Sequence, residues 1–213
     1  MGMVFLKDIK AAWKSVYSTN FMIVISIIVI MAVTFIVNLP SYFNFIQDRK
    51  GFILEDRLLL ILPSADLSWI IFPIIQLSII TGILHLLSYP KILITGILAY
   101  FLVMIIRMLT IYLIPLEPPQ GLVLLNDPLN EVLFYGQKII TKDLFFSGHV
   151  STICILFQTA QNKILKKIFF LLIFMVAAMI LIQHVHYTID VIAAPVFTWL
   201  CYKISSSIFY RLS

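Results

Sequence analysis

The chain has 213 residues, of which 62% are hydrophobic and 12% charged, with 15 lysines and arginines against 10 aspartates and glutamates. A soluble domain of this length needs far more polar surface to cover its core, so the composition excludes a soluble protein and indicates an integral membrane protein. No charged stretch is long enough to form a separate soluble domain. The sequence predicts one all-helical membrane domain, residues 21–213, after a short N-terminal segment.

The two cysteines, Cys154 and Cys201, both lie inside apolar stretches. This placement supports neither a disulfide framework nor a cysteine metal site, and we expect no metal or other cofactor. The N-terminus lacks a myristoylation signal, and no small-residue cleavage site follows the first apolar run. We therefore expect the first apolar segment to remain as a membrane anchor.

Residues 1–20 carry three lysines beside Trp13 and Tyr17. The pattern is typical of an interfacial amphipathic segment or of a positive anchor for the first helix, and we place it on the cytoplasmic side. Later apolar runs are long enough to cross a hydrocarbon core of about 30 Å. They predict six membrane helices, at 21–38, 67–89, 92–114, 144–161, 168–182 and 188–209.

Several residues modify this helical pattern. Pro40 is expected to end the first helix, and His85 is expected to be interfacial near the end of the second. Arg107 lies inside the third helix, where it must face protein, water or a phosphate, because an arginine in hydrocarbon costs about 3 kcal/mol or more. The loop at 115–142 is rich in turn formers and is expected to be a lid or a substrate-entry element.

Six crossings place both termini on one side of the membrane. The excess of lysine and arginine on that side predicts that it is cytoplasmic. The cations expected there are Lys7, Lys10, Lys14, Lys91, Lys163, Lys166, Lys167, Lys203 and Arg211, and those expected opposite are Arg49, Lys50, Arg57, Lys138 and Lys142. The polar ends of the fourth and sixth helices then share the non-cytoplasmic face, which is luminal or extracellular.

A histidine and an aspartate begin the sixth predicted helix. His186 and Asp190 are four residues apart, so their side chains lie on one helix face. The carboxylate can accept a hydrogen bond from one imidazole nitrogen and leave the other free to attack or to take a proton. The pair is therefore a candidate for the base-and-orienter half of a nucleophilic site.

The fourth predicted helix offers a second histidine beside an anion site. His149 follows Ser147 and Gly148. Free backbone amides at a helix start attract phosphate, glycine permits close approach, and the serine can cap the helix or bind a phosphoryl oxygen. Protonated His149 could donate to a leaving oxygen.

Together these groups predict phosphoryl or phosphodiester transfer. One histidine attacks phosphorus, the other protonates the departing alcohol, and Arg107 with helix-end amides neutralises the equatorial oxygens. Two alternatives remain open. The polar residues could merely cap helices at an interface, or His184, His186 and a carboxylate could bind zinc.

Two segments resemble a known family. Residues 143–149 (Asp-Leu-Phe-Phe-Ser-Gly-His) and 186–190 (His-Tyr-Thr-Ile-Asp) are similar to the two signature blocks of the sphingomyelin synthase family, a branch of the type 2 phosphatidic acid phosphatase superfamily. Weaker similarity lies at 62–66 and 107–112, and the resemblance covers about residues 60–205.

The resemblance implies a six-helix fold with an exoplasmic site in which Asp190 orients His186, the nucleophile or base, and His149 assists the leaving group. It also implies transfer of phosphocholine or phosphoethanolamine from a phospholipid donor to ceramide or a similar lipid alcohol acceptor. We expect no nucleic-acid partner, and the oligomeric state stays open. The residues expected to bind substrate are Arg107, Asp143, Ser147, Gly148 and Tyr187.

Two departures from the family pattern leave the head group and the acceptor open. Val150 stands where the family usually has threonine, and Thr141 and Lys142 replace the Cys-Gly of animal members.

The closest alternative function is a lipid phosphate phosphatase with water as acceptor. Those enzymes carry a Lys-x6-Arg-Pro block and an arginine six residues before the nucleophilic histidine, whereas here Met108 follows Arg107 and residue 180 is isoleucine. Fewer cations favour a singly charged phosphodiester and hence the transferase. A non-enzymatic lipid-binding protein is disfavoured, because three ionisable groups gathered at the membrane face are energetically costly unless they have a function. A transporter is also disfavoured, because no inverted repeat is evident in the sequence.

Overall fold

The structure is a computed structural model that describes residues 9–14, 19–125 and 140–212. Within these residues there is no β-strand, and one isolated bridge joins Phe52 to Leu116. The expected all-helical class is confirmed. The helices are α2 (Thr19–Asp48), α3 (Arg57–Ile61), α4 (Ser68–Leu86), α5 (Pro90–Leu113), α7 (Gly148–Thr159), α8 (Lys163–Ile182) and α9 (Thr188–Leu212).

In the described part of the chain, five helices are long and apolar enough to cross a membrane, namely α2 from Ile25 onward, α4, α5, α8 and α9 up to Phe209. They indicate an integral membrane protein. The six expected spans are not confirmed, because α7 has 12 residues. A helix of that length extends about 18 Å, against a hydrocarbon core of about 30 Å.

The fourth predicted helix was expected to begin at residue 144, and this prediction is wrong because the backbone before Gly148 is bonded elsewhere. The Phe146 carbonyl accepts from Arg107 Nε at 2.6 Å, and the Ser147 N–H donates to the Asp190 carbonyl at 3.1 Å. The helix therefore begins at Gly148, with Ser147 as its N-cap.

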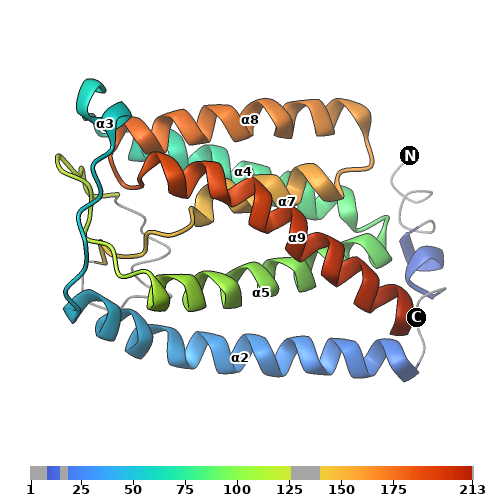
Figure 1. Cartoon of the computed structure of the whole chain (residues 1–213). Helices are drawn as coiled ribbons and strands as arrows, with labels where there is room; N and C mark the ends of the chain where they lie inside the picture. Colours follow the sequence, from blue (N-terminus) through green and yellow to red (C-terminus); the bar gives the residue numbers. More distant parts are fainter. Residues whose placement is uncertain (1–8, 15–18, 126–139, 213) are drawn as a thin grey trace.

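Helix α7 occupies the centre of the bundle, where it contacts α4, α5, α8 and α9 (Figure 1). Two glycines bring neighbouring helices close to it. A Cβ on Gly82 would lie 2.5 Å from Leu156, and one on Gly96 would lie 3.0 Å from Thr159. The core around α7 includes the buried residues Phe146, Val150, Ile153, Cys154, Val176, Ile180, Ala194 and Cys201.

The first membrane helix is longer than predicted. Helix α2 continues through Pro40 to Asp48, so the prediction that Pro40 ends it is wrong. Two contacts with α5 hold the part after the proline: Tyr42 Oη donates to the Met108 carbonyl at 2.5 Å, and Arg49 Nη1 donates to the Tyr112 carbonyl at 2.8 Å. Such contacts compensate for the backbone hydrogen bond that a proline removes.

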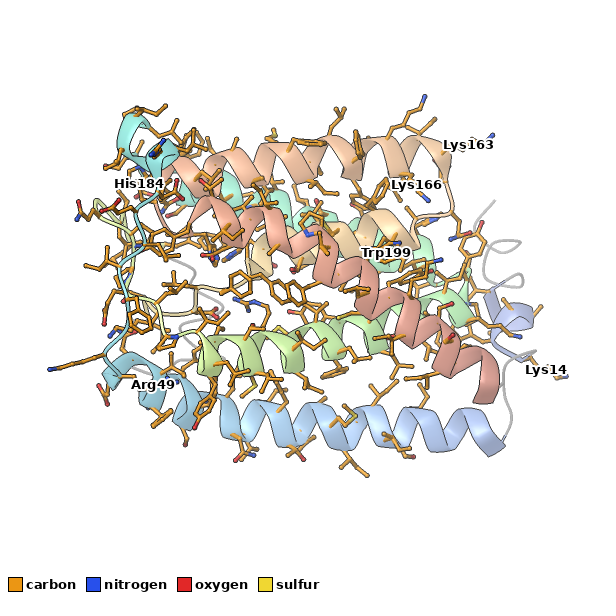
Figure 2. All side chains as sticks on the ribbon, in the orientation of Figure 1. Lys14, Arg49, Lys163, Lys166, His184 and Trp199 are labelled. Carbon is orange, nitrogen blue, oxygen red and sulfur yellow. The ribbon has the colours of Figure 1, made fainter. Side chains whose placement is uncertain are left out.

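The bundle has two distinct ends. Figure 2 shows Lys14, Lys163 and Lys166 at one end and Arg49 and His184 at the other. We call these the lysine end and the site end. Helix α2 begins and α9 ends at the lysine end (Figure 1), which agrees with the expected grouping of charges. That the lysine end is cytoplasmic stays a prediction.

Of the N-terminal segment 1–20, the structure describes residues 9–14 as helix, together with the first two residues of α2. Trp13 Nε1 donates to the Leu87 carbonyl at 2.9 Å, so this short helix contacts the turn between α4 and α5. The rest of the predicted interfacial segment lies outside the described residues.

The connections at the site end are tied to one another. Phe52 N–H donates to the Pro115 carbonyl and Glu117 N–H to the Phe52 carbonyl, both at 2.8 Å, and Lys142 Nζ pairs with Glu117 at 2.9 Å. The hydrogen bond from Lys142 holds the pKa of Glu117 below its ordinary value. Residues 126–139 of the predicted lid lie outside the described residues.

Candidate active site

The turn at the start of α9 supplies the predicted histidine and carboxylate. His186 Nδ1 lies 3.3 Å from Asp190 Oδ2, and both side chains are almost completely buried. The same carboxylate oxygen accepts from the Tyr187 N–H at 3.0 Å, while Asp190 Oδ1 is buried without a hydrogen-bond partner. With a carboxylate at Nδ1, the neutral ring carries its proton there and leaves Nε2 as the basic nitrogen.

The second predicted histidine faces the first. The ring centroids of His149 and His186 are 6.4 Å apart, with the rings inclined by 68°. His149 is half-buried, and its Nδ1 is buried without a hydrogen-bond partner. Phe72 from α4 packs edge-on against it, at 6.2 Å between centroids. The imidazole of His149, in the first turn of α7, thus lies near that of His186, in the turn before α9, as predicted.

The start of α7 is fixed to the start of α9. Ser147 is fully buried, and its Oγ accepts weakly from the Val150 N–H at 3.5 Å, as an N-cap does. Its own N–H donates to the Asp190 carbonyl at 3.1 Å. The predicted cap is present, and this backbone bond joins the segment that carries His149 to the one that carries His186.

The buried cation of α5 reaches the same place. Arg107 Nη2 pairs with Asp143 Oδ1 at 2.8 Å, and Nε donates to the Phe146 carbonyl. The guanidinium lies directly against Gly148, where an added Cβ would be 2.8 Å from Nη1. We expected Arg107 to face protein, water or a phosphate, and in the structure it faces protein. Its guanidinium bonds to the segment that leads into α7.

Tyr187 lies one residue beyond His186 and is 1% exposed. Its hydroxyl accepts from the Leu54 N–H at 3.2 Å and donates to the Glu117 carbonyl at 2.9 Å. These contacts give Tyr187 a structural role that the sequence did not reveal. Its expected contact with substrate stays a prediction.

His184 bonds to loops near the site end. Its Nδ1 is 2.9 Å from the Gln120 carbonyl, and its Nε2 is 3.2 Å from the Leu62 carbonyl. Both ring nitrogens thus contact carbonyl oxygens, whereas a zinc ligand needs one nitrogen facing the metal. Among the described residues, no three histidine, cysteine or acidic side chains gather in a way that could hold a metal.

Two residues near the site were missed by the sequence reasoning. Phe72 carried no signal beyond being apolar in a membrane helix. Asp56 carried a weak signal, because an aspartate before an apolar turn is typical of an N-cap. In the structure its carboxylate also bonds to Thr188 at the start of α9.

Gly148→Ala is expected to reduce any reaction at this site about 10- to 100-fold, because the new methyl group would displace the Arg107 guanidinium. Initial rates at saturating and at low substrate would measure the loss. Gly96→Ala is a matched control, since its methyl group would press on Thr159 at the other end of α7. Equal rates for both variants would contradict a role for the space at residue 148.

Comparison with known proteins gives one match. Residues 142–207 match the family model described as PAP2 superfamily C-terminal. No curated protein and no solved structure matches the chain. Members of the superfamily are phosphatases or phosphotransferases, and the match does not single out the sphingomyelin synthase branch. It supports the type 2 phosphatidic acid phosphatase superfamily through the segment that carries His149, His186 and Asp190.

Proposed function

We propose that this protein is a membrane phosphotransferase that moves a phospho-alcohol head group from a glycerophospholipid to ceramide or a similar lipid alcohol. The observation that carries the proposal is the pair of imidazoles 6.4 Å apart between centroids, one of them held by a buried carboxylate. A phosphorus atom between the rings would have a nucleophile on one side and an acid on the other.

In the first step, His186 Nε2 attacks the phosphorus of the donor phosphodiester. A bond forms between nitrogen and phosphorus, and the bond between phosphorus and the diacylglycerol oxygen breaks. His149, which the negative charge of the bound phosphodiester would keep protonated, gives its proton to that oxygen. Asp190 stabilises the positive charge that develops on His186, because its Oδ2 is 3.3 Å from Nδ1.

In the second step, the acceptor hydroxyl gives its proton to His149 and its oxygen attacks phosphorus. The bond between phosphorus and nitrogen breaks, which restores neutral His186 and protonated His149. Diacylglycerol and the new phospholipid are the products. Each proton that His149 releases in the first step is thus recovered in the second.

The electrostatic surroundings favour a singly charged phosphodiester. The first amides of α7 and the guanidinium of Arg107 can stabilise negative charge on the equatorial oxygens. Arg107 is already paired with Asp143, so the local excess of positive charge is small. A phosphomonoester, with up to two charges, would need more compensation, and this argues against a lipid phosphate phosphatase.

The sidedness of the reaction is part of the proposal. The cations that the sequence places at the lysine end outnumber those that it places at the site end, which favours the cytoplasm at the lysine end. The reaction would then take place on the luminal or extracellular side of the membrane. Its lipid partners would be a phospholipid donor and a lipid alcohol acceptor in that leaflet.

The test uses membranes that contain the wild-type protein, given a head-group-labelled phospholipid with ceramide, with diacylglycerol or with no added acceptor. We expect a labelled new phospholipid with ceramide, and its loss in His149→Ala. His85→Ala is the matched control, because His85 lies in the last turn of α4 and contacts Gln161 at the lysine end.

Three outcomes separate the possible functions. Transfer that depends on the acceptor supports the proposal. A labelled water-soluble product that forms equally without an acceptor would indicate a phosphatase or phosphodiesterase. Equal product from the wild type, His149→Ala and membranes without the protein would contradict an enzyme and favour a lipid-binding protein.

A further inference from the structure

The connection between α2 and α4 covers the site end of the bundle. It contains the short helix α3, which lies beside the end of α8 and the beginning of α9 (Figure 1). Two residues of this connection, Leu54 and Asp56, bond to Tyr187 and Thr188, the first two of the three residues that separate His186 from Asp190. The connection therefore acts directly on the turn that carries the proposed nucleophile.

Asp56 contacts Thr188 through both of its carboxylate oxygens. Its Oδ2 accepts from the Thr188 N–H at 2.6 Å, and its Oδ1 accepts from Thr188 Oγ1 at 3.0 Å. Thr188 is the first residue of α9, so its N–H has no acceptor within the helix. A carboxylate from 132 positions earlier in the chain supplies the missing acceptor.

The other contact is made to Tyr187. The Leu54 N–H donates to the tyrosine hydroxyl at 3.2 Å. Leu59, which is 6% exposed, belongs to the buried cluster that contains Tyr187. The backbone N–H of Tyr187 donates to Asp190 Oδ2, the oxygen that also contacts His186 Nδ1. A shift of residues 187 and 188 would therefore change the geometry of the His186 and Asp190 pair.

We propose that Asp56 is a positioning residue, which holds the first turn of α9 so that Asp190 orients His186 for the transfer proposed above. Asp56 acts through Thr188 and does not touch the substrate. The inference rests on the proposed function for its catalytic consequence, while the hold on the turn can be measured without any substrate. Rates depend steeply on such placement, since a displacement of about 1 Å can cost about 100-fold.

The charge state of Asp56 fits this role. Partial burial raises the pKa of its carboxyl, but the hydrogen bonds from Thr188, Leu59 and Leu58 together lower it below the ordinary value. The carboxylate is therefore charged at neutral pH. A lowered pKa means that the contact contributes to stability above the ordinary pKa of aspartate and that the contribution is lost as the pH falls.

Asp56→Asn separates the two roles of this carboxylate. Asp56 also caps α3, since Oδ1 accepts from the Leu58 and Leu59 N–H groups. Asparagine caps helices about as well as aspartate, so α3 should survive. Its Nδ2 cannot accept from the Thr188 N–H, so that bond to α9 is lost, while Oδ1 can still accept from Thr188 Oγ1. The substitution thus removes the hydrogen bond from the Thr188 N–H and keeps the cap on α3.

We expect kcat for Asp56→Asn to fall about 10- to 100-fold, with KM within about threefold of the wild-type value. Glu55→Gln is the matched control, because Glu55 is the exposed neighbour of Asp56, and it should leave both constants unchanged. Thr188→Val removes the second hydrogen bond. Because each substitution removes a different hydrogen bond between Asp56 and Thr188, the double variant should lose more than either single variant.

Hydrogen exchange of the segment containing residues 186–190 provides the second measurement. Faster exchange in Asp56→Asn than in Glu55→Gln supports the hold on the turn, and unchanged exchange overturns it. Wild-type-like kcat in Asp56→Asn would also overturn the role of Asp56. If the wild type shows no transfer but hydrogen exchange at residues 186–190 is still faster in Asp56→Asn, the proposed function is refuted and the positioning role of Asp56 is not.

Discussion

Replacing His186 with alanine is expected to reduce transfer by about 10⁴-fold or more, because the variant lacks the nitrogen that would bond to phosphorus. A donor labelled in its phosphate should leave acid-labile label on the wild-type protein when the acceptor is omitted. His186→Ala should carry none. His149→Ala should still acquire label, more slowly, because it keeps the nucleophile and lacks the acid. This pattern would assign the two histidines their separate roles.

The matched control for this substitution is again His85→Ala at the lysine end, which should transfer and label normally. Asp190→Asn should give an intermediate loss of about 10² to 10⁴-fold, since the amide would favour the wrong tautomer of His186. Label on His149 and not on His186 would reverse the assignment. A His186→Ala protein that still transfers at the control rate would contradict the mechanism.

The parts of the site that depend on local spacing could be predicted from the sequence. His186 and Asp190 are four residues apart, and they meet as expected, although His186 lies in the turn before α9 and not on a face of the helix. Ser147 before Gly148 marks a helix start in the same way. The meeting of His149 with His186 needed one further step, namely that an up-and-down helix pair returns the chain to the same end of the bundle.

The features that depend on tertiary contacts could not be predicted from the sequence. A pattern of apolar residues gives a helix from residue 144, whereas the backbone there bonds to Arg107 and Asp190, so α7 is short and central. Pro40 is a local helix breaker, yet contacts between α2 and α5 keep the helix intact. The bond between Asp56 and Thr188 joins positions too far apart for any periodic pattern to reveal.

The ion pair between Arg107 and Asp143 leads to the second large prediction. Arg107 is 5% exposed and Asp143 21% exposed, and the arginine also holds the carbonyl of Phe146 before α7. Removing one partner of a buried pair leaves the other charge uncompensated, which costs about 3–5 kcal/mol. The same loss would also withdraw positive charge from the reacting phosphate, for a further decrease in rate of about 10² to 10³-fold.

Arg107→Met is therefore expected to lose both stability and transfer, and the two losses can be separated by a second substitution. In Arg107→Met with Asp143→Asn, the orphaned carboxylate is gone, so the free energy of unfolding should recover by about 1–3 kcal/mol while transfer stays low. Thermal unfolding in detergent and initial rates in membranes measure the two quantities. Arg49→Met is the matched control at the same end, because Arg49 stacks on Tyr112 outside the site. If Arg107→Met and Arg49→Met have the same unfolding temperature and the same initial rate, Arg107 neither holds α7 nor binds the phosphate.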